Sequence, residues 1–245
     1  MKKVLVHLHL FYLNQWSYFA EKLSNIDDCD WDLFVTVCPN EDDYDEYEKF
    51  EETQKDILSF KPDAKIITVE NAGYDILPFL NVLKSVNLDD YDFVLKLHTK
   101  GMRNEVLNFN GIPFCGAFWM KRLVDSMLYS KEIFTQNLKI LSREEYGMVV
   151  DSFFYINLQN YPEDTTLLDE LKKQLNIKSQ HRKFLAGSMF FIKASILKRL
   201  LNLNISCPGK TATGNIGTIF HAVERVFTIL TDDEGYNIYT VPMFY

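Results

Sequence analysis

Cysteine is scarce in this sequence, and its few copies are not spaced for a shared role. The four cysteines are scattered and include no C-x-x-C pair: Cys29, Cys38, Cys115 and Cys207. Structural zinc sites and disulfide frameworks both need closely patterned cysteines, so this spacing argues against both. We expect reduced, mostly buried thiols.

The sequence also lacks a long hydrophobic run. A membrane-spanning helix needs roughly 18 or more apolar residues in succession, and no stretch approaches that length. The first residues, MKKVLVHLHLFYLN, carry two histidines and lead into a helix-like segment. They are therefore more typical of a first β-strand than of a signal peptide, and we expect a cytoplasmic protein.

Basic residues are fewer than acidic residues in this sequence. The chain has 26 Lys and Arg against 34 Asp and Glu, which gives a formal net charge of −8. Nucleic-acid binding needs a basic face that displaces counterions from phosphates, so no nucleic-acid partner is expected. Any anionic ligand would have to meet a local cluster of cations.

Glycine is absent from the segment that follows the first strand. A dinucleotide-binding enzyme carries G-x-G-x-x-G there, whereas this chain reads HLHLFYLNQW. A dehydrogenase-like fold is therefore disfavoured. Internal repeats and low-complexity linkers are missing as well, and the length of 245 residues fits one domain or one domain with a small annex.

What the first half does contain is a regular alternation of strand and helix patterns. Strand-like stretches at 4–11, 31–38, 64–71 and 91–101 alternate with helix-like stretches at 14–26, 45–60 and 75–86. Such alternation predicts a parallel sheet with helices on both faces. Ligands of these sheets gather at the carboxyl ends of the strands.

The second half is less regular. A loop is expected over 102–116, then one long helix over 118–142 and a short apolar segment over 147–154. Helical patterns follow at 165–177, 194–203 and 218–230, with a strand at 184–193 and an extended segment at 236–245.

An acidic run, EDDYDEYEKFEE, holds eight carboxylates in twelve positions, 41–52. Carboxylates favour the start of a helix, where unpaired backbone N–H groups point outward, so a solvated helix end accounts for the run. A metal site is the weaker alternative because no glycine turn accompanies it.

Three basic side chains end the fourth strand pattern, in YDFVLKLHTKG. In an extended chain Lys96, His98 and Lys100 share one face. They are either lysines that snorkel at a strand end or a cradle for a diphosphate.

Two further segments could carry chemistry. In NAGYD, Gly73 allows a sharp turn and Asp75 is placed to cap the next helix, while contact of Asn71 or Asp75 with a sugar or base is an equal alternative. In HAVERVF, a helix would group His221, Glu224, Arg225 and Thr228 on one face, as an exposed polar face or as a set for proton abstraction and phosphate binding.

Six motifs follow one another across nearly the whole chain: HLHLFY, NAGYDILPFL, YDFVLKLHTK, Trp119, FLAGSMFF and HAVERVF. In this order they resemble the rhamnan synthesis F (RgpF-like) family of bacterial polysaccharide glycosyltransferases. The resemblance implies an α/β, GT-A-like (Rossmann-like) fold with a mostly parallel central sheet and helices on both faces. A single domain would span 1–245, with a nucleotide-binding half at about 1–116 and an acceptor-side half at about 117–245.

The same resemblance implies roles for individual residues. Glu224, with Asp75 as the second candidate, would take the proton from the acceptor hydroxyl. Trp119, Gly187, Ser188 and Met189 would lie on the acceptor side. The donor and its diphosphate would meet the remaining residues: His9, Asn71, Gly73, Asp75, Lys96, His98, Lys100, His221 and Arg225.

Most GT-A enzymes place an Asp-x-Asp at the end of this strand to hold a divalent ion against the donor diphosphate. This chain reads Leu-His-Thr there, at 97–99. Our hypothesis is that Lys96, His98 and Lys100 neutralise the diphosphate as fixed cations. No metal ligand is assigned, and a divalent cation, Mn²⁺ or Mg²⁺, stays open as a cofactor.

The implied function is transfer of a sugar from a nucleotide-diphosphate donor, of dTDP-rhamnose or UDP-galactose or galactofuranose type, to a glycan or lipid-linked glycan acceptor, with inversion. The product would be a bacterial surface polysaccharide of the cell wall or capsule. The enzyme would act at the inner face of the plasma membrane, with peripheral membrane association left open. The alternative is a non-catalytic subunit that binds nucleotide sugar or carbohydrate in a polysaccharide assembly complex.

Overall fold

The computed structural model describes residues 1–38, 44–101, 107–109, 112–160, 165–205 and 218–242. A central sheet of seven strands has the order β11-β7-β10-β4-β1-β2-β3. These strands are β1 (Lys3–Leu10), β2 (Asp30–Val37), β3 (Lys65–Thr68), β4 (Phe93–His98), β7 (Tyr146–Asp151), β10 (Phe190–Lys193) and β11 (Asn237–Val241).

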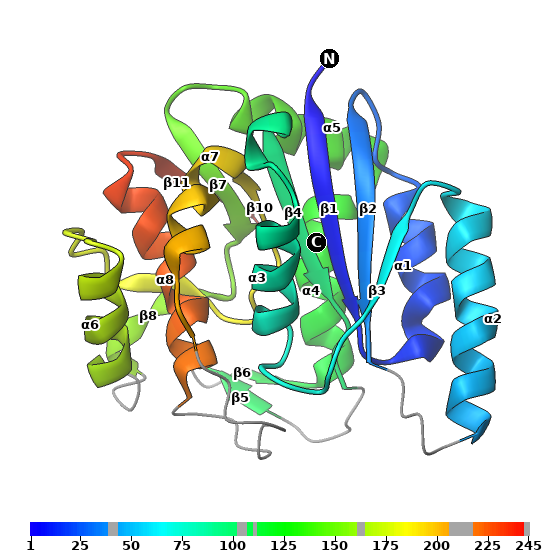
Figure 1. Ribbon diagram of the computed structural model, residues 1–245. Coiled ribbons are helices and arrows are strands. Elements are labelled where there is room, and N and C mark those ends of the chain that lie inside the picture. Colours follow the sequence, from blue (N-terminus) through cyan, green and yellow to red (C-terminus); the bar gives the residue numbers. More distant parts are fainter. Residues whose placement is uncertain (39–43, 102–106, 110–111, 161–164, 206–217, 243–245) are drawn as a thin grey trace.

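The sheet is parallel except at one strand. β1 pairs in parallel with β2 and β4, β2 with β3, and β11 with β7. β10 lies between β4 and β7 and is antiparallel to both. The start of β10 therefore reaches the edge of the sheet at which β1 and β4 end, near the bottom of Figure 1.

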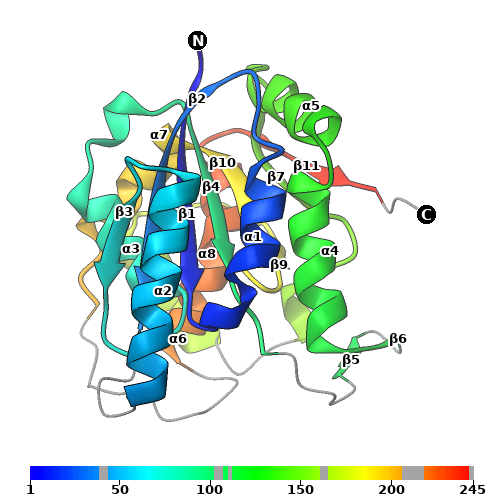
Figure 2. The ribbon, with the colours of Figure 1, turned by 90° about the vertical axis from the view of Figure 1, so that its right-hand side faces the viewer.

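Helices cover both faces of the sheet. Figures 1 and 2 show α3 and α8 on one face and α1, α4 and α5 on the other. The predicted α/β class, with a mostly parallel central sheet between helices, is confirmed. The main helices are α1 (Trp16–Leu23), α2 (Tyr44–Phe60), α3 (Ile76–Ser85), α4 (Gly116–Leu128), α5 (Lys131–Leu141), α6 (Thr165–Gln174) and α8 (Ile219–Asp233).

Burial on both faces explains the near-continuous apolar runs of the central strands. Every residue of β1 after Lys3 is buried, and so is every residue of β4. A strand covered on both faces has no water-facing side, so it does not need the polar alternation of a half-exposed strand. The polar side chains inside these two strands are therefore buried exceptions.

Three elements of the second half differ from the prediction. The long helix expected over 118–142 is two helices, because Ser130 caps α5 by accepting the backbone N–H of Ile133 at 3.4 Å. The loop expected over 102–116 contains a hairpin of β5 (Leu107–Phe109) and β6 (Ile112–Phe114). The strand expected over 184–193 is two strands that belong to different sheets.

The first of these two strands, β9 (Lys183–Leu185), pairs with β8 (Tyr155–Asn157) in a small sheet, and the second is β10. After β10 the predicted helix is a short α7 (Ala194–Leu197), followed by a 3₁₀ turn. The predicted helix start in the acidic run agrees with α2, which begins at Tyr44.

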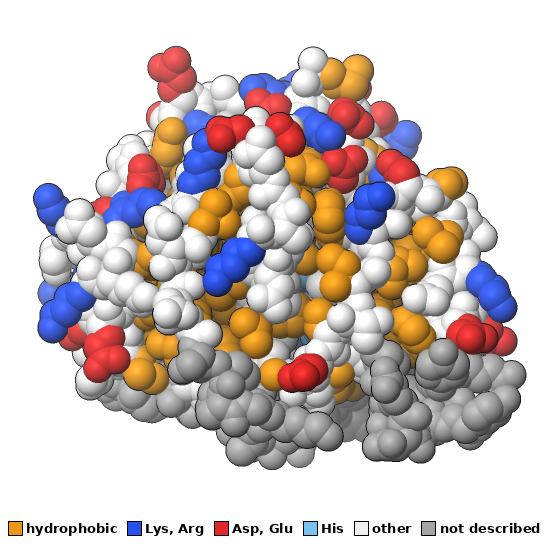
Figure 3. All heavy atoms as spheres, in the orientation of Figure 1, with side chains coloured by type: hydrophobic (Ala, Val, Ile, Leu, Met, Phe, Trp, Pro, Cys, Tyr) orange, Lys and Arg blue, Asp and Glu red, His pale blue; other side chains and the backbone are white. Residues whose placement is uncertain are grey.

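The described cysteines are half-buried rather than buried as expected, and Cys207 lies outside the described residues. Among the helices that the structure describes, none is long and apolar enough to cross a bilayer. On the face seen in Figure 3, acidic and basic side chains are interspersed among neutral and hydrophobic ones.

Candidate active site

A row of polar side chains is buried on one face of β1 and β4. His7 lies opposite Lys96 in the register, and His9 lies opposite His98. Lys96 and His98 do share one face of β4, as the spacing predicts, and all four side chains are buried. Charged and polar groups in such a place need partners, because burial without them is costly.

Lys96 finds its partners inside the protein. Its side chain is 0% exposed, and its ammonium group donates to the carboxylate of Asp75 and to the carbonyl of Ser188 at 3.0 Å. The expectation that all three basic groups project openly toward a diphosphate is therefore wrong for Lys96. Its charge is used to hold α3 and the start of β10 against the sheet.

Asp75 occupies the N-cap position of α3, but its side chain makes no capping hydrogen bond. It turns inward instead, accepting from Lys96 and, at 2.6 Å, from the Ser188 hydroxyl. Burial by itself raises the pKa of Asp75, but the neighbouring His98 ring, the charge of Lys96 and these hydrogen bonds outweigh it and hold that pKa well below the ordinary value. A carboxylate held in this way is a poor proton acceptor.

His98 is also engaged internally. Its Nε2 donates to the carbonyl of Gly187 at 2.7 Å, and Asp75 lies 3.8 Å from the same nitrogen. Burial lowers the pKa of His98 to about 3, which makes the ring neutral at physiological pH. His98 therefore anchors the turn before β10 rather than supplying a positive charge.

His7, Thr36 and His9 form a buried chain that the sequence reasoning did not identify, although His9 itself was a candidate. The Thr36 hydroxyl lies 3.0 Å from Nε2 of His7 and 2.9 Å from Nδ1 of His9. Burial lowers the pKa of His9 to about 4, so the ring is neutral at physiological pH. The spacing HLHL, which puts both histidines on one strand face, was the signal available in the sequence.

The turn before β10 is built on two left-handed residues, Gly187 (φ 98°) and Ser188 (φ 45°). A Cβ on Gly187 would lie 2.6 Å from Cδ1 of Leu123 and 2.7 Å from Nε1 of Trp119. Only glycine fits this position, because it alone combines the conformation with the missing side chain. Trp119 fixes the same turn by donating to the carbonyl of Ala186 at 3.3 Å.

Glu224 on α8 faces this turn. It accepts the backbone N–H of Gly187 on Oε1 at 2.7 Å. Burial raises the pKa of Glu224, opposed by that hydrogen bond and by Arg225. A half-buried carboxylate with a raised pKa suits a general base better than Asp75 does.

Lys100 is the half-buried member of the basic trio. Its ammonium group lies 3.8 Å from the centre of the Trp119 ring, a cation–π contact. Burial lowers the pKa of Lys100 to about 8, partly offset by Asp75 and Glu224. Gln15 also anchors the main chain here by donating to the Lys100 carbonyl at 2.7 Å. This cation, its aromatic support and Glu224 thus belong to one cluster.

The other candidate residues on α8 are less exposed to solvent than expected. Arg225 is 3% exposed, donates to the carbonyl of His221 at 2.6 Å and lies over the Phe184 ring at 4.7 Å. Thr228 is fully buried. The polar face predicted for this helix is therefore an internal one. His221 is half-buried, with its ring 5.3 Å from that of Tyr74.

The remaining predicted residues have different surroundings. Gly73 has φ 69°, and a Cβ there would lie 2.8 Å from the Phe220 ring, so a glycine is required. Asn71 is exposed in the loop before α3. Met189 is fully buried in the hydrophobic core, which removes its side chain from contact with an acceptor.

No group of three His, Cys, Asp or Glu side chains within the described residues could hold a metal ion. Mg²⁺ and Mn²⁺ prefer carboxylate oxygens, and the Asp75 carboxylate, 3.8 Å from Nε2 of His98 at the end of β4, already binds Lys96 and Ser188. The described residues thus do not fit such an ion at this position.

A match to a family model shows how this chain is related to known proteins. The model described as rhamnan synthesis protein F (RgpF) matches residues 1–236. The chain belongs to the rhamnan synthesis protein F family. The resemblance inferred from the six motifs is confirmed.

Two relatives of this RgpF-family chain are both named uncharacterized protein WxcX. The one from Xanthomonas campestris pv. campestris strain B100 is 25% identical over 248 residues, and the one from strain ATCC 33913 is 27% identical over 243 residues. Each match covers 96% of this chain and 32% of the relative. The chain thus spans about a third of the length of these curated relatives.

Solved structures similar to this RgpF-family chain include a mannosyltransferase from Pyrobaculum calidifontis in complex with GDP-Man and Mn²⁺. The TM-score is 0.46 at 11% identity, covering 98% of this chain and 55% of the other. Glucosyl-3-phosphoglycerate synthase from Mycobacterium tuberculosis with UDP gives 0.38 at 13% identity, covering 96% and 81%.

Proposed function

We propose that this chain is a glycosyltransferase that moves a sugar from a nucleotide-diphosphate donor, of dTDP-rhamnose or UDP-galactose or galactofuranose type, to a growing bacterial surface polysaccharide. Family membership supports the class of reaction. The observation that carries the proposal is the pairing of Glu224 with the Gly187 turn beside Lys100, at the edge where parallel strands end.

The chemistry follows from these side chains. Glu224 takes the proton of the acceptor hydroxyl as its oxygen attacks the anomeric carbon, and the bond from that carbon to the diphosphate oxygen breaks. The nucleoside diphosphate leaves with the bonding electrons. Lys100, with a pKa of about 8, is about ten parts protonated to one neutral at pH 7 and offsets part of the charge that develops. Attack from the face opposite the leaving group gives inversion.

Three residues around Glu224 and Lys100 have supporting roles in this proposal. Lys96 and Asp75 hold the turn and α3 in place, and Trp119 supports Lys100. The donor half would be about 1–116 and the acceptor half about 117–245, within one domain. The acceptor would be a glycan or lipid-linked glycan at the inner face of the plasma membrane.

One observation favours a second candidate function. Lys96 and His98 are occupied internally, so Lys100 is the member of the trio left to meet a diphosphate. A nucleotide-sugar or carbohydrate-binding subunit without turnover needs fewer cations than a transferase, because it does not stabilise a departing diphosphate.

A donor screen with and without metal separates these functions. The chain is mixed with UDP- and dTDP-sugars, and both donor hydrolysis and the shift in melting temperature are recorded. Turnover supports the transferase, whereas a sugar-specific shift without turnover supports the binding subunit. Turnover that persists in EDTA supports neutralisation by fixed cations. Turnover that is lost in EDTA and returns with Mn²⁺ contradicts it.

A further inference from the structure

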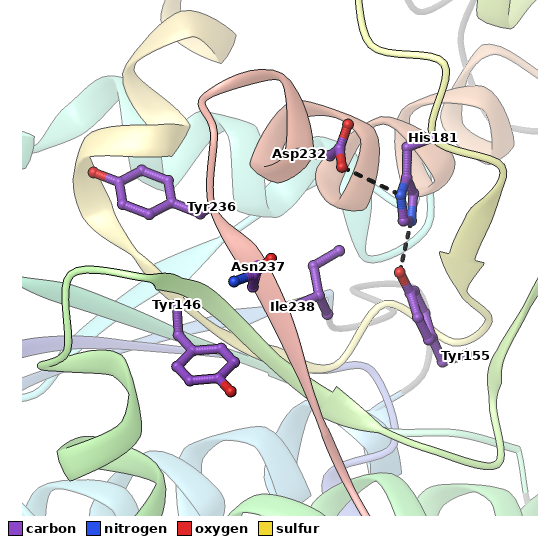
Figure 4. Close-up of a pocket in the computed structure, with 7 residues that line it drawn as sticks. All are labelled: Tyr146, Tyr155, His181, Asp232, Tyr236, Asn237 and Ile238. Atoms are coloured by element: carbon purple, nitrogen blue, oxygen red, sulfur yellow. Dashed lines mark hydrogen bonds and ion pairs between the residues drawn. The ribbon is translucent and has the colours of Figure 1, made fainter.

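A concave site lies away from Glu224, where β7, β8, β11 and α8 approach one another. It is a cavity of about 380 Å³. Figure 4 shows Asn237 and Ile238 between two groups of aromatic side chains. Its lining is Tyr146, Tyr155, His181, Asp232, Tyr236, Asn237 and Ile238.

The lining combines flat apolar surfaces with hydrogen-bonding groups. Three tyrosine rings provide the surfaces, and the Asn237 amide, the Asp232 carboxylate and the tyrosine hydroxyls provide donors and acceptors. A sugar residue has the matching chemistry, with C–H groups on the face of its ring and hydroxyls around the rim. The volume lies within the range of small-ligand sites.

Charge argues against an anionic occupant. The lining holds one carboxylate, Asp232, and no lysine or arginine; the ammonium groups of Lys183 and Lys193 lie outside the lining, 5.5 Å and 4.3 Å from the ring centres of Tyr155 and Tyr236. Burial lowers the pKa of His181, which leaves that ring neutral at physiological pH. A phosphate or nucleotide would therefore meet no opposite charge in the lining and would face Asp232.

The polar groups are already held in place. The Tyr155 hydroxyl lies 2.6 Å from Nε2 of His181, and the two rings are stacked at 22°. Asp232 accepts the Ser179 hydroxyl at 2.6 Å and lies 3.6 Å from Nδ1 of His181. Side chains fixed before binding lose less conformational entropy when a ligand arrives.

The cavity is connected to the candidate active site through two rigid elements. Asp232 follows Glu224 by eight residues on α8, which is ~12 Å along the helix axis. Tyr155 pairs in register with Leu185, two residues before Gly187. A glycan a few sugars long can span such a distance, so one chain could occupy both places.

We propose that this cavity is a subsite for a neutral sugar residue of the acceptor glycan, remote from the sugar that receives the transfer. The acceptor part rests on the proposed function, whereas binding of neutral glycan does not. The subsite would select acceptors by length, because only a chain that reaches it gains these contacts.

The test is an NMR titration of the intact chain, with ring signals of Tyr155 and Tyr236 as reporters. The probes are a rhamnose tetrasaccharide, maltotetraose and, as an anion, UDP. We expect saturable shifts of both rings with at least one tetrasaccharide and none with UDP. No shift with either tetrasaccharide up to about 10 mM, or a shift with UDP, would overturn the proposal.

Two variants locate the binding. Tyr155→Phe removes only a hydroxyl and Asn237→Ala changes an exposed side chain, so both keep the packing. We expect each to weaken tetrasaccharide binding about two- to tenfold, the effect of one neutral hydrogen bond. Tyr129→Phe, at an exposed tyrosine elsewhere, is the matched control. Unchanged affinity in both variants overturns the assignment.

Binding of the donor is measured separately in the same samples. Nucleotide sugars are followed by the indole signal of Trp119, next to Lys100. Glycan binding without a nucleotide response contradicts the proposed function alone. A nucleotide response without glycan binding contradicts the subsite alone.

Discussion

Lys96 and Asp75 form an ion pair beneath α3 in which the lysine is fully buried and the carboxylate side chain is 14% exposed. The Ser188 hydroxyl completes the arrangement by donating to the same carboxylate oxygen. These residues come from β4, the start of α3 and the turn before β10. The pair therefore joins three segments that are far apart in the sequence.

Removing one charge of this pair should destabilise the protein strongly. Asp75→Asn leaves the Lys96 ammonium buried without a counter-charge, at a cost of about 3–5 kcal/mol. For a chain of this size the melting temperature should fall by on the order of 10 °C in calorimetry. Asp89→Asn breaks the exposed pair with Lys198 and is the matched control, with little change expected.

The double variant Asp75→Asn with Lys96→Met tests the explanation. Because it removes the stranded charge as well, it should recover part of the lost stability. Purely additive losses from the two single changes would show that the residues do not act as a pair.

The pair also predicts that the protein loses stability in acid. Since the pKa of Asp75 is depressed on folding, its stabilisation is complete above about pH 4 and is lost as the pH falls further.

Glu224→Gln should abolish transfer while leaving nucleotide binding nearly intact. The amide can still accept the Gly187 N–H but cannot take a proton, so we expect kcat to fall about 10²- to 10⁴-fold. Product formation and calorimetric titration of the donor measure the two effects. Glu234→Gln, just past the end of α8, is the control and should retain activity. Normal turnover in Glu224→Gln would remove this residue from the role of base.

The pH dependence of kcat/KM should be bell-shaped. On the acid side activity falls as Glu224 gains its proton, at a pH above the ordinary glutamate value because burial raises its pKa. On the alkaline side it falls above about pH 8 as Lys100 loses its proton. Lys100→Arg should extend the alkaline limb, since guanidinium stays charged. An unmoved alkaline limb in that variant would exclude Lys100 as its source.

Gly187→Ala should cost more stability than Gly235→Ala, although both glycines have positive φ, 98° and 82°. An added methyl at Gly187 collides with Leu123 and Trp119, whereas at Gly235 it meets open space. We expect about 1–2 kcal/mol from backbone strain at either site, and a further 1–3 kcal/mol at Gly187 alone. Thermal unfolding, together with Trp119 fluorescence, compares the two. Equal losses would mean that the close packing at the turn is unimportant.

Much of the fold could be predicted from the order of patterns in the sequence. Alternating strands and helices in the first half indicated β1 to β4 and the helices between them, and residue spacing placed Lys96 and His98 on one face. The break at Ser130 and the two strands around Gly187 were missed, because each depends on local capping or on a left-handed turn inside an apolar run.

The partners of the candidate site residues could not be read from spacing. Lys96 meets residues that are 21 and 92 positions away in the sequence, Asp75 and Ser188. A strand pattern tells which face a lysine is on, but not whether that face is covered by a carboxylate. The tyrosine-lined cavity was missed for the same reason, since its residues come from five separate segments and share no motif.

The one antiparallel strand of the described central sheet, β10, has a consequence for exchanging specificity between relatives. Because β10 starts at the edge of the sheet where the neighbouring strands end, residues 186–189 form a turn at that edge. Trp119 donates to the Ala186 carbonyl, and Glu224 accepts the Gly187 N–H. Exchanging residues 186–189 alone would leave Trp119 and Glu224 facing a turn to which they are not matched. A chimera that keeps the contacts of this segment must carry Trp119 and Glu224 and also Asp75, Lys96 and His98, which bind Ser188 and Gly187.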